Sequence, residues 1–348
     1  MGKARAFPLA RGFVFATLSA LIGCADSALP EAVVVAEHRY ISSYASDGEW
    51  VYWGAGGSEE ESFSLWRAPR DGPAERVADG LSAPLGLILG EGAAYWTTQY
   101  GFGACASSLF ALSPDDDAPR NLTPEHAGEA GEGMCILGLV KARRDELLLV
   151  HRNDLDEPML LSAEPRGDGP AEIAEVVAPI GEEDGGLRAV ARPQPGVFAF
   201  LLGNAVVRVT RSGETRHVAR GGLRSPAAIA ASSAGDIVWA DNQFPELPAE
   251  VHQEGKGVIA IVEDASVTAM DVVDGDVWVA ALRDDSGDGL LLRIGGDDGA
   301  VESFEIPYRP RHIIADGGDL LIRATPRREP GEEGFDDPER LLRQPLPP

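Results

Sequence analysis

Hydrophobic and polar positions follow a pattern that recurs seven times along the chain. In each copy a turn residue precedes a short run rich in aliphatic, β-branched or aromatic side chains. These turn residues are Gly48, Gly92, Asp145, Gly196, Gly235, Gly275 and Gly318. Their spacing of 39 to 53 residues, with strands of this length, is typical of a β-propeller, whose blades are four-stranded sheets.

The remaining runs of each copy complete the blade. An apolar run precedes the turn, as at 85–89, a third run follows the loop, as at 258–262, and a weaker fourth run ends the copy, as at 301–306. We therefore expect an all-β fold, a single seven-bladed propeller of four-stranded antiparallel blades over residues 32–348. Six blades are the alternative, because the copy at Asp145 has the weakest aromatic signature.

The last copy has only three strands, and residues 32–36 (Ala-Val-Val-Val-Ala) supply a candidate for the fourth. Pairing this N-terminal strand with the last copy would close the ring and remove an open sheet edge.

Two short strands and two longer segments resemble known propeller repeats. Tyr95-Trp96-Thr97-Thr98 and Val238-Trp239-Ala240-Asp241 resemble the strands of Tyr-Trp-Thr-Asp propellers. Segments 83–96 and 225–239 are similar to NHL and streptogramin-lyase-like repeats. The resemblance implies the architecture and says little about activity, because one fold serves many functions.

The first residues are typical of an export signal. Lys3, Arg5 and Arg11 precede an uncharged apolar stretch at 12–23, which is shorter than the roughly 20 residues that span a bilayer. Leu21-Ile22-Gly23-Cys24 resembles the lipobox of bacterial lipoproteins. That resemblance implies a signal peptide at 1–23, acylation of Cys24, a tether at 24–31 and, because Ala25 follows, anchoring in the outer membrane of the cell envelope. A plain secretory signal is the alternative.

Two further cysteines remain, Cys105 and Cys135. In an exported chain an even pair suggests one disulfide, and two free thiols are the alternative.

The chain is strongly acidic, with a formal net charge of −26. Removing Lys3, Arg5 and Arg11 with the signal peptide leaves −29 from Cys24 onward. This charge argues against nucleic acid and against anionic membrane surfaces, which select positive patches. We expect a monomer that contacts the membrane through its lipid only.

Acidic residues gather in the loops between the second and third strands of the copies. We expect these loops to form a negative face that binds a protein or peptide, which could be basic. The candidate residues are Glu59, Glu60, Glu61, Asp154, Asp156, Asp241, Glu246 and Glu250, with Tyr100, Phe102 and Phe244 adding contact area. Simple solvation of loop tips is the alternative.

Metal binding and catalysis have weaker signals. Asp284, Asp285 and Asp288 lie among glycines at a spacing that suits Ca²⁺, but the later Glu of an EF-hand loop is missing. A lyase or hydrolase working over the central channel is the alternative function. Its weak catalytic candidates are His151 and His252, which we expect in loops of the acidic face.

Overall fold

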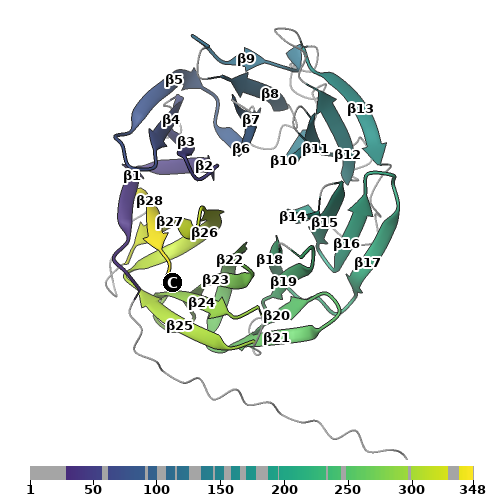
Figure 1. Ribbon diagram of the computed structural model, residues 1–348, viewed down its shortest axis with the longest axis vertical. Helices are drawn as coiled ribbons and strands as arrows, with labels where there is room; N and C mark the ends of the chain where they lie inside the picture. Colours follow the sequence, from purple (N-terminus) through teal and green to yellow (C-terminus); the bar gives the residue numbers. More distant parts are fainter. Residues whose placement is uncertain are drawn as a thin grey trace, which may run out of the picture.

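The computed structural model is a ring of β-sheets (Figure 1). It describes residues 29–56, 62–90, 93–99, 107–113, 116–124, 135–143, 146–152, 158–164, 170–177, 187–194, 196–232, 234–243, 248–296, 299–327 and 337–347. The described strands form seven four-stranded antiparallel sheets, which we number as blades 1 to 7. The all-β propeller architecture expected from the repeat is confirmed, and the copy at Asp145 forms a sheet of its own, β10-β11-β12-β13.

Six blades are each built from four strands that are consecutive in the sequence. Blade 1 contains β2 (Tyr40–Ser46), β3 (Trp50–Gly56), β4 (Phe63–Pro69) and β5 (Glu75–Leu81). Blade 2 contains β6 (Pro84–Gly90), β7 (Ala93–Gln99), β8 (Ser107–Leu112) and β9 (Arg120–Asn121). Blade 3 contains β10 (Cys135–Arg143), β11 (Glu146–Arg152), β12 (Pro158–Glu164) and β13 (Glu172–Val177). Blade 4 contains β14 (Leu187–Gln194), β15 (Val197–Leu202), β16 (Ala205–Thr210) and β17 (Thr215–Arg220). Blade 5 contains β18 (Pro226–Ala231), β19 (Ile237–Asp241), β20 (Ala249–Gln253) and β21 (Gly257–Val262). Blade 6 contains β22 (Ala265–Val273), β23 (Asp276–Arg283), β24 (Gly289–Ile294) and β25 (Val301–Ile306).

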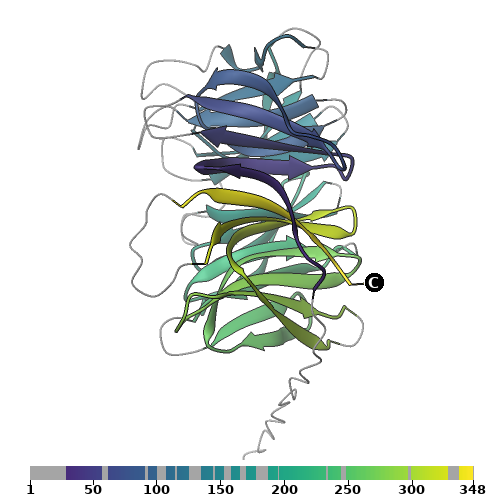
Figure 2. The ribbon, with the colours of Figure 1, turned by 90° about the vertical axis from the view of Figure 1, so that its left-hand side faces the viewer.

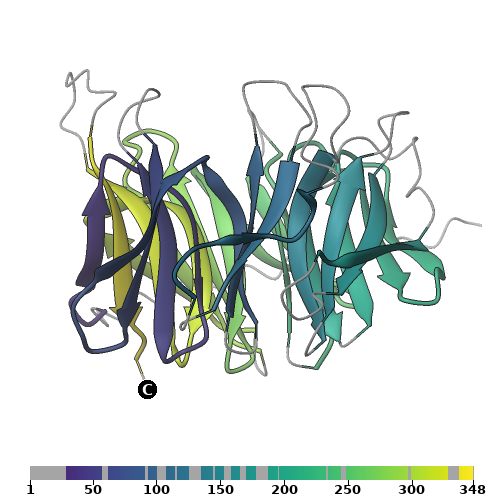
Figure 3. The ribbon, with the colours of Figure 1, turned by 90° about the horizontal axis from the view of Figure 1, so that it is seen from above.

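Blade 7 joins the two ends of the chain. It contains β26 (Tyr308–Asp316), β27 (Asp319–Pro326), β28 (Glu339–Pro345) and, paired with β28, the N-terminal β1 (Val33–His38). The purple and yellow strands run side by side in Figures 2 and 3. The expected closure by an N-terminal strand is therefore confirmed, with Val34 opposite Leu342 and His38 opposite Glu339.

The repeating turns have a backbone cause. Gly48 and Gly275 precede the second strands of their blades with φ of 89° and 95°, a region that side chains other than glycine rarely occupy. In the first of these turns, Oδ1 of Asp47 also accepts hydrogen bonds from the backbone N–H groups of Glu49 (3.0 Å) and Trp50 (2.8 Å). Glycine therefore recurs at these positions because the turn of the hairpin requires a positive φ.

The hydrophobic core lies between neighbouring blades. One cluster joins Val238 and Val251 of blade 5 to Val279 of blade 6, and another joins Trp53 of blade 1 to Leu341 of blade 7. A tryptophan from the second strand anchors four of the blades by stacking on a ring one or two strands farther out. The pairs are Trp53–Trp66, Trp96–Phe110, Trp239–His252 and Trp278–Phe304. The tryptophans that gave the sequence its repeat signature are thus core residues.

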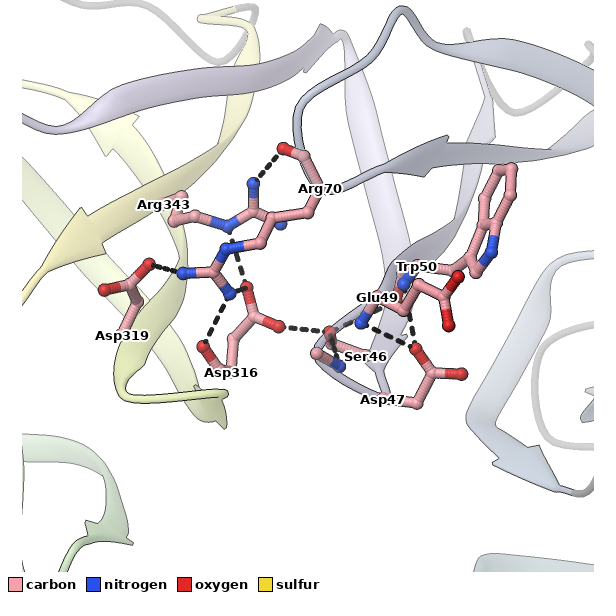
Figure 4. A network of polar contacts seen from close by, with 9 residues as sticks. Ser46, Asp47, Glu49, Trp50, Arg70, Asp316, Asp319 and Arg343 are labelled. Atoms are coloured by element: carbon pink, nitrogen blue, oxygen red, sulfur yellow. Dashed lines mark hydrogen bonds and ion pairs between the residues drawn. The ribbon is translucent and has the colours of Figure 1, made fainter.

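A polar network fastens blade 7 to blade 1 (Figure 4). The Asp316 side chain is 0% exposed and pairs with Nε of Arg343 at 2.8 Å. Arg343 Nη1 also donates to the carbonyl oxygen of Arg70 at 2.5 Å, Arg70 pairs with Asp319, and the Ser46 hydroxyl donates to Asp316. Because Arg70 and Ser46 belong to blade 1, this network reinforces the ring where it closes.

Blade 5 departs from the expected strand order. The run at 258–262 lies in its fourth strand, β21, and the third strand, β20, falls inside the segment that the pattern assigned to a long loop. Only Ala249 and Val251 of β20 are buried, so its hydrophobic signal is short and interrupted by polar residues.

Candidate functional site

The first strand of every blade lies at the centre of the ring (Figure 1). We call these the axial strands: β2, β6, β10, β14, β18, β22 and β26. Each begins at the end of the ring where the second strand of its blade ends, as the pairings Tyr40 with Gly56 and Leu187 with Leu202 show. All seven starts therefore surround the same end of the axis, which we call the entry end.

Every axial strand is bulged close to its start. The register skips Ser42, Leu137, Arg188, Ala227, Thr268 and Arg311 in six blades, and residues between Leu85 and Ile88 in blade 2. A bulge bends the strand and redirects side chains, and bulges concentrate at rims and binding sites. The bulges therefore form a repeated device at the entry end.

Hydroxyl groups at two of the bulges bridge neighbouring blades. Ser43 donates to the carbonyl oxygen of Pro84 at 2.8 Å, and Thr268 donates to the carbonyl oxygen of Pro310 at 3.2 Å. These bonds hold adjacent axial strands together, so the side chains that they carry sit on a rigid support.

A histidine and a tyrosine meet at the seam between blades 7 and 1. Nδ1 of His312, on β26, lies 3.0 Å from the hydroxyl oxygen of Tyr44, on β2. The Tyr44 hydroxyl donates its single proton to the carbonyl oxygen of Leu321 at 3.3 Å, so Nδ1 of His312 is the donor in the first bond. The second ring nitrogen, Nε2, then carries the lone pair of the neutral imidazole.

The surroundings keep this imidazole neutral. His312 retains an exposed surface, while burial against the ring and then the charge of Arg323 lower its pKa to about 4. Burial also raises the pKa of the Tyr44 hydroxyl well above its ordinary value. At pH 7 the pair is therefore an uncharged hydrogen-bonding unit.

Two charged side chains flank the pair. Nη1 of Arg323 donates to the backbone carbonyl oxygens of Ile41 (2.8 Å) and Ser42 (3.4 Å). The Asp271 carboxylate accepts hydrogen bonds from the N–H groups of Ala315 (2.6 Å) and Val272 (2.8 Å), and burial raises its pKa. Both side chains bind backbone, so their first role is to position the axial strands around His312.

The charge of the axial strands is opposite to that of the whole chain. They contain six basic residues, Lys141, Arg143, Arg188, Arg192, Arg309 and Arg311, and two acidic ones, Asp271 and Asp316. The chain as a whole has 30 basic and 56 acidic residues. The axial strands therefore contain more basic than acidic residues, although the chain as a whole is acidic.

Several predicted face residues have structural roles instead. Asp241 is buried at the end of β19, where its carboxylate accepts hydrogen bonds from the backbone N–H groups of Arg224 and Ser225. Glu250 and His252 lie on β20, and Glu250 Oε2 is 3.2 Å from Nε2 of His252. Their placement in a loop was wrong, because that loop contains β20.

His252 packs against the tryptophan of its own blade. Its ring stacks on Trp239 with centroids 5.2 Å apart and an interplanar angle of 3°. The half-buried His252 thus packs within blade 5. His151 lies on β11, the second strand of blade 3, so its placement in a loop was wrong as well.

Two of the three aspartates proposed for calcium, Asp284 and Asp288, bind other side chains of the protein. Asp284 accepts a hydrogen bond from the Ser266 hydroxyl at 2.7 Å, and Asp288 pairs with Nε of Arg327 at 2.7 Å. Across the described ranges, no three His, Cys, Asp or Glu side chains are grouped to hold a metal ion.

The remaining candidates lie outside the described residues. They are Cys24, Glu59, Glu60, Glu61, Tyr100, Phe102, Cys105, Asp154, Asp156, Phe244 and Glu246, and for Cys135 only its place at the start of β10 is described. The disulfide between Cys105 and Cys135 and the acidic binding face therefore stay predictions. Within the part of the chain that is described, no helix is long and apolar enough to cross a membrane.

Sequence reasoning missed the Tyr44–His312 pair. The two residues are 268 positions apart, and only ring closure brings them together. The available signal was the place of His312 in the run before a turn, which in a propeller is the axial strand.

Comparison with solved structures identifies the class of fold. The acylaminoacyl peptidase of Pyrococcus horikoshii matches with a TM-score of 0.58 and 11% identity, over 88% of this chain and 52% of that one. A puromycin-hydrolyzing peptidase of Mycobacterium tuberculosis matches with a TM-score of 0.60 and 16% identity, over 86% and 51%. The chain thus spans about half the length of these peptidases.

A third structure is itself a propeller. The β-propeller domain of the Trilobed protease from Pyrococcus furiosus, described as having an open velcro topology, matches with a TM-score of 0.56 and 10% identity, over 82% of this chain and 91% of that domain. No family model and no curated protein matches the sequence. At these identities the likeness establishes the β-propeller fold alone.

Proposed function

We propose that this propeller is a binding platform for a peptide or protein segment, which it holds at the entry end of its axial strands. The observation that carries the proposal is the exposed, neutral His312, fixed by Tyr44 and flanked by the exposed Arg311 on a strand tied to its neighbours. A polar group held on a rigid support suits recognition of a chain that carries many hydrogen-bonding groups. Three structural neighbours whose names describe peptidases or a protease support peptides as the ligand class.

Selection from a random peptide library on the immobilised full chain tests this function. We expect enriched peptides that bind the wild type at least tenfold more tightly than the double variant R311A/H312A. The matched control is R216A/H217A, which removes an exposed arginine and histidine from the outer strand β17. Enriched peptides that bind all three proteins equally, or a library without enrichment, would refute the platform.

A hydrolase is the second candidate, and the peptidase neighbours favour it. In that function the neutral His312 would accept a proton at Nε2, the chemistry expected of a general base. Release of p-nitroaniline from aminoacyl p-nitroanilides that is lost in His312→Gln and kept in His217→Gln would support it. Equal release by both variants would remove His312 from the mechanism.

Export and anchoring belong to the same proposal. The lipobox at 21–24 supports acylation of Cys24 and display of the ring from the cell envelope, most simply its outer membrane. Metabolic labelling with a palmitate analogue, which the Cys24→Ser variant should abolish, tests the acylation.

A further inference from the structure

The outer strand of blade 5 differs from the outer strands of the other blades. β21 forms the edge of its sheet, at the circumference of the ring (Figure 1). Of the seven outer strands that the structure describes, β1, β5, β9, β13, β17 and β25 each contain Asp, Glu or Arg, whereas β21, Gly-Val-Ile-Ala-Ile-Val, contains no charged residue. Because charges on an edge strand oppose pairing with another chain, β21 lacks a protection that the other edges have.

Two large aliphatic side chains of β21 face solvent on the same side of blade 5. Val258 is 46% exposed and Ile261 is 54% exposed. Val258 lies opposite His252 of β20, Ile261 lies opposite Glu250, and the register skips Ile259 between them. Positions 250 and 252 are two apart on β20 and so share one face of the sheet. The two aliphatic side chains opposite them therefore share that face as well.

Opposite charges flank the strand. Lys256 is exposed immediately before β21, and Glu263 is exposed immediately after it. Neither side chain forms an ion pair with another residue in the described part of the chain. An antiparallel pairing places the start of one strand beside the end of the other. Two copies of β21 would thus bring Lys256 of each copy to Glu263 of the other.

We propose that β21 pairs antiparallel with β21 of a second copy of this chain, about a two-fold axis. The register that sets Val258 opposite Ile261 of the second copy also sets Lys256 opposite its Glu263, because both pairs are placed symmetrically about the centre of β21. Main-chain hydrogen bonds between the two edges supply affinity, as they do wherever a strand is added to a sheet. Because a two-fold contact uses both edges, association ends at a dimer.

The net charge of the chain opposes this contact. Each copy carries −26, which is why a monomer was expected from the sequence. At about 0.15 M salt the repulsion between distant charges is screened over about 8 Å, whereas the uncharged edges and the two Lys256–Glu263 pairs are in direct contact. We therefore expect the dimer at this salt concentration. Since β21 lies at the circumference and the axial strands lie at the centre (Figure 1), the contact is independent of the proposed peptide site.

Sedimentation velocity of the full chain over a concentration series, at about 0.15 M salt, tests the dimer. We expect a monomer–dimer equilibrium whose dissociation constant rises at least tenfold in Ile261→Lys. The matched control is Val33→Lys, which puts the same charge on a 58% exposed valine of the outer strand β1 and should leave the dissociation constant unchanged. Thermal unfolding of each variant checks that the ring is intact.

Charge exchange tests the register. Lys256→Glu and Glu263→Lys should each weaken the dimer, and the double variant K256E/E263K should restore it, because the exchanged charges meet again across the two-fold axis. Hydrogen exchange of the β21 amides should slow as the protein concentration rises, in the wild type and not in Ile261→Lys. A double variant as weak as the single ones would overturn the antiparallel register. A wild type that stays monomeric, a dimer unaffected by Ile261→Lys, or a dimer lost in Val33→Lys would overturn the proposal as a whole.

Discussion

At the scale of single residues, the buried pair of Asp316 and Arg343 is the most exacting contact at the closure of the ring. The Asp316 side chain is fully buried and that of Arg343 is 10% exposed. Removing one partner of a buried pair leaves an unpaired charge in the interior. The Ser46 hydroxyl also loses its acceptor when Asp316 is replaced.

We therefore expect Asp316→Ala to lower the free energy of unfolding by about 3 to 5 kcal/mol. Urea denaturation measures the change. The control is Arg340→Ala, which removes a surface pair with Glu37 whose side chains are 41% and 47% exposed; it should cost about 1 kcal/mol or less. An equal loss of unfolding free energy in the two variants would show that the buried Asp316–Arg343 pair stabilises the ring no more than a surface pair does.

The lowered pKa of His312 predicts how stability depends on pH. In the unfolded chain the pKa is 6.5, and in the ring it is about 4, so the unfolded state binds more protons between these values. Stability contributed by the neutral imidazole is present above pH 6.5 and is lost as the pH falls toward 4. His312→Gln should show a shallower fall of the melting temperature over this window.

His217→Gln, on the exposed outer strand β17, is the matched control for that comparison. It should follow the wild type across the whole pH series, measured by differential scanning fluorimetry. If His312→Gln also follows the wild type, the imidazole is not held neutral by its surroundings.

At the scale of elements, the sequence predicted the features that every blade must repeat. Turn glycines such as Gly48 recur because of their positive φ, and tryptophans such as Trp96 recur because each fills the space between blades. Features that depend on how two strands pair could not be predicted from the sequence. A bulge such as that at Arg311 has no composition of its own, because it exists only in the register of β26 against β27.

The candidate site was harder to predict for the same reason. Net charge favoured an acidic binding face, whereas the described axial strands carry an excess of arginine and lysine. That excess emerges only when strands from separate copies are gathered around one axis. His252 was placed in a loop because the polar residues Glu250, Gln253 and Glu254 surround it in the sequence, although its ring lies against Trp239.

The N-terminal strand β1 is the element on which closure depends. A chain beginning at residue 39 leaves the edge of β28 unpaired, while a chain beginning at residue 29 keeps β1. We expect the shorter chain to melt at a lower temperature and its β28 amides to exchange with solvent at least tenfold faster, as hydrogen-exchange mass spectrometry would show. Identical protection of β28 in both chains would mean that β1 is dispensable.

At the scale of the whole molecule, hydrophobic clusters shared between blades stabilise the ring, and repulsion among its negative charges destabilises it. Among the described residues, the hydrophobic clusters join neighbouring blades, and we therefore expect one cooperative unfolding transition. The net charge of −26 opposes compactness. The melting temperature should therefore rise between about 0.01 and 0.15 M NaCl as the Debye length falls from about 30 to 8 Å. A fall over this range would show that ion pairs such as Arg343–Asp316 dominate the response.

The pairing of β1 with β28 also has a consequence in time. Glu37 and Arg340, which pair across these strands, are 303 positions apart, so a growing chain must make almost all of the ring before β1 finds its partner. Until then β1 is an unpaired strand with exposed Val33 and Val34, free to associate with other chains. Synthesis thus has a vulnerable interval that ends in a single late step, and a factor that shields β1 during this interval would raise the yield of closed rings.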